Sequence, residues 1–112
     1  MLIDIVDLKL SVQGALLGNV FPSLRGVCVR SSENVISVYF YCDGEISEEA
    51  NDLYESALDD ILSDFWRTPK DNEPKMGFDF QIIRLDYPHK MPQIGSCVYL
   101  RYEDESKYII NE

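Results

Sequence analysis

The chain has 112 residues, a length that fits one domain with a core of its own. Hydrophobic residues make up 46% of it and aromatic residues 12%, which excludes a disordered or low-complexity chain. Twenty acidic residues oppose ten basic ones, and the net charge of −10 argues against direct binding to nucleic acid or to an anionic membrane. We therefore expect a single domain, residues 1–112, that attracts basic proteins.

The cysteines and the N-terminal segment indicate the cellular compartment of the protein. Cys28, Cys42 and Cys97 are odd in number and irregularly spaced, which predicts reduced thiols rather than a disulfide framework. The N-terminal segment lacks the basic start of a signal peptide. No apolar run approaches the ~20 residues that are needed to span a bilayer. These features predict a cytoplasmic protein with no membrane-spanning segment.

The first expected elements are a helix and a hairpin. The stretch SVQGALLGN predicts a helix that Ser11 can cap, or that begins earlier, near Asp4, and that Gly18 ends in the left-handed conformation. Two strands follow, LRGVCVRS and VISVYFYC, and the short polar segment between them predicts an antiparallel hairpin. Both faces of the second strand are rather apolar, so we expect it to lie in the centre of a sheet.

A second helix is expected from Ser47, whose hydroxyl can cap it, to Thr68–Pro69, which would end it. Its apolar residues recur every three or four positions, as in an amphipathic helix packed on a core. Strands FDFQIIRLD and CVYLRYE follow, and we expect the tail from Asp104 to be loosely held. The order α-β-β-α-β-β predicts an α+β fold, with helices packed on a four-stranded antiparallel or mixed sheet.

The sequence contains no recognisable catalytic or metal-binding motif. The one histidine, His89, lies in a proline-rich loop, and no pair of histidines or cysteines has metal-ligand spacing. The acids of DGEISEEAND do not fit a calcium loop, because Gly44 comes too early and Ser47 begins a helix. The glycines form no phosphate-binding pattern. We therefore expect a protein that is not an enzyme and that uses neither a metal nor a cofactor.

The most unusual segment is residues 43–64, which hold nine carboxylates and no basic residue. On a helical wheel, Glu48, Asp52, Glu55 and Asp59 cluster opposite the apolar arc. Like charges three or four residues apart repel, which costs on the order of 1 kcal/mol in total. A solvated surface is the plain explanation of this stripe, whereas capture of a basic protein would also compensate the repulsion.

A surface that captures a basic protein also needs apolar contact, and tyrosine and tryptophan commonly supply it. Trp66, Tyr41 and Tyr54 are the candidates, although the position of Tyr54 on the apolar arc favours a place in the core. The predicted partner-binding residues are Asp43, Glu45, Glu48, Glu49, Asp52, Glu55, Asp59 and Trp66.

Three stretches carry a resemblance to a known family: GALLGNVFPSLRGVCV, VYFYCDGEISEE and IIRLDYPHKMPQIGSCVYLRYE. The matching features are Ala15-Leu16-Leu17-Gly18, Pro22 with Leu24-Arg25, Asp43-Gly44-Glu45, Arg84-Leu85-Asp86-Tyr87-Pro88 and Val98-Tyr99-Leu100-Arg101. Over residues 11–103 the chain resembles the small bacterial immunity proteins of contact-dependent growth inhibition and related polymorphic toxin systems. The resemblance implies a cytosolic protein that binds the toxic domain of a cognate effector and blocks it. Many such toxins are nucleases, and a nuclease must be basic to hold phosphate.

The leading interpretation is thus a non-enzymatic immunity protein, favoured as a monomer, that neutralises a basic nuclease toxin by direct binding. Arg25, Arg84 and Arg101 lie on predicted strands and are expected to pair with acids such as Asp86 or Glu103. Two alternatives stay open. A small enzyme or ligand-binding domain would show His89, Cys97 and a buried acid converging in a deep pocket. An adaptor subunit would dimerise through an exposed sheet edge.

Overall fold

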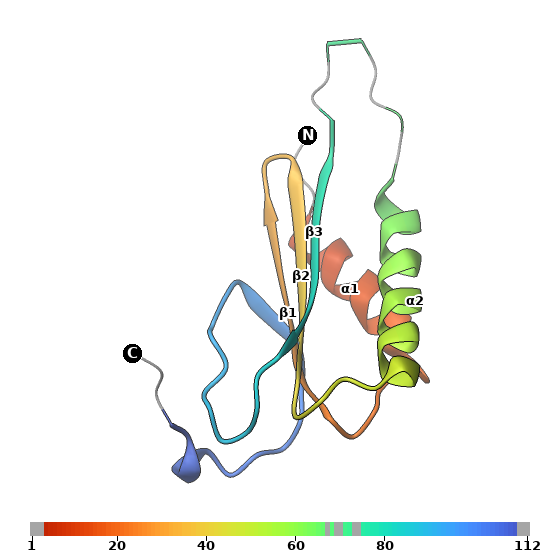
Figure 1. Cartoon of the computed structure of the whole chain (residues 1–112). Helices are drawn as coiled ribbons and strands as arrows, with labels where there is room; N and C mark the ends of the chain where they lie inside the picture. Colours follow the sequence, from red (N-terminus) through yellow and green to blue (C-terminus); the bar gives the residue numbers. More distant parts are fainter. Residues whose placement is uncertain (1–3, 67, 69–70, 73–74, 110–112) are drawn as a thin grey trace.

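The computed structural model describes residues 4–66, 68, 71–72 and 75–109 of the chain (Figure 1). The elements are α1 (Ile5–Leu16), β1 (Leu24–Ser32), β2 (Val35–Cys42), α2 (Glu48–Phe65), β3 (Gly77–Arg84), β4 (Ser96–Leu100) and a short 3-10 turn, η1 (Glu105–Lys107). The predicted order α-β-β-α-β-β and the α+β class are confirmed. The four strands form one mixed sheet in the order β3-β2-β1-β4.

The sheet is built around the predicted hairpin. β1 and β2 pair antiparallel, and Ser32 stands opposite Val35 across a two-residue turn. β3 lies parallel to β2, which requires a crossover, and α2 supplies it. β4 pairs antiparallel with β1 on the other side. The central place predicted for β2 is confirmed, because β2 has a neighbouring strand on each edge.

The start of α1 corresponds to the earlier of the two expected positions. Asp4 is the N-cap, and its carboxylate accepts a hydrogen bond of 2.8 Å from the backbone N–H of Val6. A cap at Ser11 is wrong, because Ser11 lies within the helix and donates its hydroxyl proton to Asp64 instead. Leu8 is completely buried, so a helix that began at Ser11 would lose this core residue. Gly18 ends the helical segment at a φ of 78°, as predicted.

α2 begins as expected and ends earlier. The Ser47 side chain accepts a 3.0 Å hydrogen bond from the backbone N–H of Ala50, which confirms the predicted cap. The helix ends at Phe65, since Trp66 already has an extended backbone. Pro69, which was expected to mark the end, lies outside the described residues.

The core lies between the sheet and the two helices, which cover the same face of the sheet (Figure 1). Alternate residues of β1 and β2 point into it, among them Val27, Val38 and Phe40. Tyr54 of α2 is also fully buried, and its ring lies 5.2 Å from that of Phe40. The structure therefore places Tyr54 in the core, as its position on the apolar arc of the helix suggested.

The other face of the sheet is partly covered by the loop after β3 and by the C-terminal segment (Figure 1). The expectation of a loosely held tail is wrong as far as Ile109. The backbone N–H of Ile109 donates to the carbonyl of Pro88 at 2.8 Å, and that of Lys90 donates to the carbonyl of Ile109 at 2.9 Å. The chain enters β4 through Gly95, where a Cβ would clash with the carbonyl oxygen of Val29. No helix among the described residues is long and apolar enough to cross a membrane.

Candidate protein-binding surface

The acids of α2 occupy its outward side. Seven carboxylates of this helix are exposed, and no ion pair joins them to a basic residue in the described part of the chain. We call these residues the acidic face: Glu48, Glu49, Asp52, Glu55, Asp59, Asp60 and Asp64. Five of them are predicted partner-binding residues, and the structure presents all five on one accessible surface.

The other predicted positions differ from one another. Glu45 is exposed in the turn before α2, whereas Asp43 is only partly exposed and pairs with Arg101 at 3.0 Å. Trp66 is 61% exposed at the C-terminal end of α2. Tyr41 is 2% exposed and Tyr54 is fully buried, so neither is available as a surface anchor. Of the three aromatic candidates, only Trp66 is accessible to a partner.

The outward side of α1 carries an apolar surface that the sequence analysis missed. Val6, Leu10 and the C-cap residue Leu17 are 57%, 61% and 80% exposed. Their spacing of four and seven residues places them along one side of the helix, and we call this set the α1 ridge. The buried residues of α1 (Leu8, Val12, Ala15 and Leu16) lie on the opposite side. A signal was present in the sequence, because α1 has more apolar residues than one buried stripe can use.

The α1 ridge and the acidic face belong to one outer surface. Both helices pack on the same face of the sheet and contact each other. The hydroxyl of Ser11 donates a hydrogen bond to the carboxylate of Asp64, which links the two helices directly at the surface. A partner that approaches the helix layer from outside therefore meets both the carboxylates of α2 and the exposed apolar side chains of α1.

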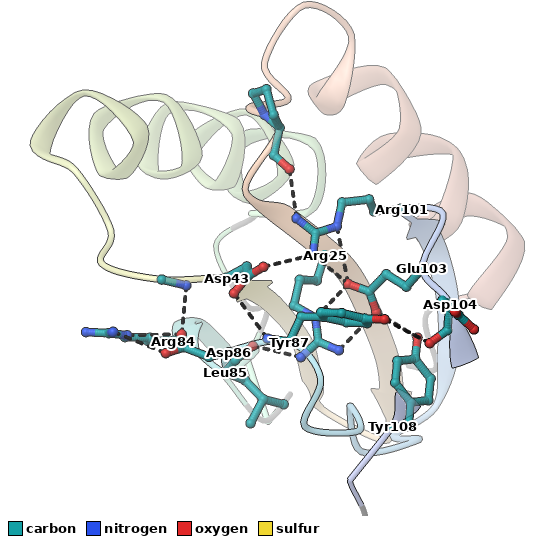
Figure 2. A network of polar contacts seen from close by, with 12 residues as sticks. Arg25, Asp43, Arg84, Leu85, Asp86, Tyr87, Arg101, Glu103, Asp104 and Tyr108 are labelled. Carbon is teal, nitrogen blue, oxygen red and sulfur yellow. Dashed lines mark hydrogen bonds and ion pairs between the residues drawn. The ribbon is translucent and has the colours of Figure 1, made fainter. Parts of the chain in front are cut away.

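A second cluster of charges lies at the far end of the sheet (Figure 2). Arg25 of β1 is completely buried, and two of its nitrogens donate to the two carboxylate oxygens of Glu103 at 2.8 and 2.9 Å. Arg101 bridges Glu103 and Asp43, at 2.8 and 3.0 Å. Asp43 in turn accepts a 3.1 Å hydrogen bond from the backbone N–H of Tyr87. We call Arg25, Asp43, Arg101 and Glu103 the buried network, and it joins the ends of three strands.

The buried network has a clear electrostatic signature at Glu103, whose side chain is 2% exposed. Burial alone would raise the pKa of this carboxyl group. Hydrogen bonds from Arg25, Tyr108 and Arg101 outweigh burial and lower the pKa of Glu103 to about 2. The carboxylate therefore stays ionised at neutral pH and balances the charge of the buried guanidinium group. Asp43 pairs with Arg101 in the same network, so it has a structural role that the sequence analysis did not predict.

The expected pairing of strand arginines with nearby acids is confirmed. Arg25 and Arg101 bind Glu103, and Arg84 binds Asp86 in an exposed pair at 3.1 Å. Asp86 also accepts a 2.7 Å hydrogen bond from the backbone N–H of Gly44. This contact fixes the turn that precedes α2. The arginines and their acids therefore stabilise the chain that leads into the N-terminal end of α2.

The pocket expected of an enzyme is present only in part. A hollow of about 650 Å³ beside β4 is lined by Cys97 and Glu103, but His89 is not in its lining. The sulfur atoms of Cys97 and Cys28 are 3.5 Å apart, and both cysteines are free. Burial, followed by the hydrogen bond and charge of Cys97, raises the pKa of Cys28 to about 12, which keeps this thiol protonated at neutral pH. No group of three or more possible metal ligands occurs among the described residues.

Residues 5–103 match the family model of the MafI2 immunity protein, so the chain is an immunity protein of the polymorphic toxin type. The match covers most of the chain, and the protein belongs to the MafI2 immunity protein family. Among curated proteins, none matches the chain significantly. The resemblance noted over residues 11–103 is confirmed and extends to Ile5.

Proposed function

We propose that this immunity protein binds a basic nuclease domain of its cognate toxin and blocks it stoichiometrically, without catalysing a reaction. Membership of the MafI2 immunity protein family supports the neutralising role. The observation that carries the electrostatic part is the acidic face, because seven exposed carboxylates share one helix with no basic residue. Such a surface attracts a positively charged partner and repels nucleic acid.

A nuclease fits this surface for a chemical reason. An enzyme that cleaves nucleic acid must present lysine and arginine side chains to the phosphates of its substrate. A helix with carboxylates on its outer side offers the same sign of charge as a phosphate backbone. It can therefore lie in the substrate cleft, or beside it, and keep the nucleic acid out.

The expected kinetic signature is fast association that depends on salt. Complementary fields raise association rate constants to about 10⁸ M⁻¹s⁻¹ or more at low salt, compared with about 10⁵–10⁶ M⁻¹s⁻¹ for neutral surfaces. Rapid capture suits an inhibitor that must act before the toxin reaches its substrate. The odd number and irregular spacing of the cysteines fit reduced thiols, which supports a cytoplasmic site of action.

Charge reversal on α2 tests the proposal. The variant combines Asp52→Lys, Glu55→Lys and Asp59→Lys. The matched control combines Glu33→Lys, Asp71→Lys and Glu105→Lys, which are exposed acids outside the helix and give the same change in net charge. The probe is the C-terminal domain of the protein encoded by the gene immediately upstream, which the proposal identifies as the toxin, with its catalytic centre inactivated. At low salt, about 20–50 mM, we expect the α2 variant to associate with the probe roughly 10–100-fold more slowly than the wild type. The association rate of the control should change by less than about threefold.

The outcomes separate the parts of the proposal. Equal association rates for the α2 variant and the control would show that the acidic face does not steer the toxin. No binding of the upstream toxin domain by the wild-type chain would overturn the proposed partner itself. If both variants keep the melting temperature of the wild type, a slower rate reports on the encounter and not on misfolding.

A further inference from the structure

We propose that the α1 ridge is the apolar anchor of the toxin complex, seated against an apolar patch that basic side chains border. This inference rests on the proposed function and adds to it the contact that holds the complex together. Charge alone gives speed and selectivity, whereas lasting complexes need a desolvated apolar centre. The acidic face cannot supply such a centre by itself, because the exposed residues within α2 are seven acids and two serines, and Trp66 lies only at its C-terminal end.

The fold itself does not use the α1 ridge. The core side of α1 is complete, since Leu8 and Val12 are fully buried and Ala15 and Leu16 nearly so. Val6, Leu10 and Leu17 project from the opposite side, where each loses contact with water only if a partner covers it. Three large apolar residues in line on an exposed helix face are typical of a helix that docks onto another surface.

Gly14 is a second, independent feature of the same surface. Glycine is one of the least favourable residues inside a helix, and its lack of a side chain allows another group to approach the backbone closely. A Cβ at Gly14 would meet nothing within 4 Å, so no contact within the protein accounts for this residue. Gly14 lies one turn from both Leu10 and Leu17, and its lack of a side chain lowers the helix surface between them. A side chain of the partner can approach the backbone at this low point.

The charges around the α1 ridge identify the kind of occupant. Asp4 and Asp7 are exposed on or beside α1, and the acidic face lies on the neighbouring helix, whereas Lys9 is the only basic residue within the two helices. A second copy docked through the same surface would bring two strongly acidic faces together, and their repulsion disfavours such a dimer. A basic protein meets no such repulsion. The toxin that the acidic face attracts is therefore the partner that fits the α1 ridge.

The two parts of the surface should affect different rate constants. Long-range attraction changes association, whereas buried apolar contacts mainly set the dissociation rate. The test variant combines Val6→Gln, Leu10→Gln and Leu17→Gln, all at exposed positions on or next to α1. The matched control combines Leu100→Gln and Tyr102→Gln, which remove exposed apolar surface near the C-terminal end of β4.

With the inactivated upstream toxin domain as probe, we expect the ridge variant to dissociate on the order of 100-fold faster than the wild type. Its association rate at low salt should stay within about threefold of the wild-type value. The control should keep both rates. Circular dichroism melting confirms that the ridge variant is folded, since its substitutions lie outside the core.

Gly14→Ala gives a test that does not remove any contact of the free protein. Alanine favours the helix and has open space here, so the melting temperature should rise, by about 3 °C. The added methyl group occupies the low point of the ridge, so the complex should dissociate about tenfold faster. A variant that is more stable alone and binds more weakly cannot be explained by partial unfolding.

Each contrary result has a distinct meaning. If the ridge variant dissociates like the wild type while the toxin still binds, the α1 ridge is not the anchor and the proposed function survives. Faster dissociation of the Leu100 and Tyr102 control alone would move the anchor to β4. A wild-type dimer in light scattering that becomes monomeric in the ridge variant would make the ridge a contact between copies, and would overturn this inference.

Discussion

The carboxylates of the acidic face and those of the buried network carry the same charge in opposite surroundings. Glu103 is buried, accepts hydrogen bonds from two arginines and Tyr108, and has a strongly lowered pKa. The acids of α2 face water on a helix that contains no basic residue. The first kind stabilises the fold of the chain, whereas the second kind slightly destabilises it through mutual repulsion. An acid that the fold pairs is therefore structural, and an acid that the fold leaves unpaired is free to attract a partner.

The largest expected effect follows from removing the charge of Glu103. The substitution Glu103→Gln leaves the buried guanidinium of Arg25 without a counter-charge, so the free energy of unfolding should fall by about 3–5 kcal/mol. Urea denaturation measures the loss. The control is Glu55→Gln on the acidic face, which should change stability by less than about 0.5 kcal/mol. Equal effects at the two sites would remove the distinction between structural and unpaired acids.

The pH dependence of the free energy of unfolding should reveal the titration of Glu103. Its pKa is about 2 in the folded protein, compared with the model-compound value of 4.5, so the folded state binds the proton less tightly than the unfolded state. The stabilisation is complete above pH ~4.5 and is lost as the pH falls from there to about 2, by on the order of 3 kcal/mol. Denaturation curves at intervals across this range measure the loss. In Glu103→Gln this decline should be shallower, and an unchanged slope would contradict the assignment.

The smallest expected effect has the opposite sign. Asp52 lies four residues after Glu48 and three before Glu55, so it repels both. The single substitution Asp52→Lys replaces these repulsions by attractions and should raise the free energy of unfolding by about 0.5 kcal/mol. Thermal melting at low and high salt measures it, and the gain should shrink at high salt. A loss of stability would mean that Asp52 has a structural role after all.

Much of this fold could be predicted from local patterns. The period of three to four residues in α2 and the apolar alternation in β1 and β2 correspond directly to their buried faces. The direction of β3 stayed open because short apolar strands do not encode their neighbours, and the α2 crossover settled it. The packing of the C-terminal segment depends on Pro88 and Lys90 in a distant loop, which no local pattern shows.

The candidate binding surface could be predicted only in part, because some of its residues depend on contacts between distant parts of the chain. The helical period predicts that the acids of α2 are exposed. In the sequence, Asp43 is indistinguishable from the other acids of this segment, so it was assigned to the same surface. Its partner, Arg101, lies far along the chain, and only the folded sheet brings the two together. The α1 ridge was overlooked because its leucines and valine resemble core residues when the start of the helix is misplaced.

The position of α2 between two paired strands affects how this protein can change over generations. α2 connects β2 to β3 in the chain, and the buried residues on its inner side, among them Tyr54 and Ile61, fix its rotation. Asp64 accepts a hydrogen bond from Ser11 of α1, but the other acids of the acidic face are exposed and can be exchanged without removing a core contact. Under the proposed function, single exchanges on this face would change the charge that the toxin meets while the core stays the same.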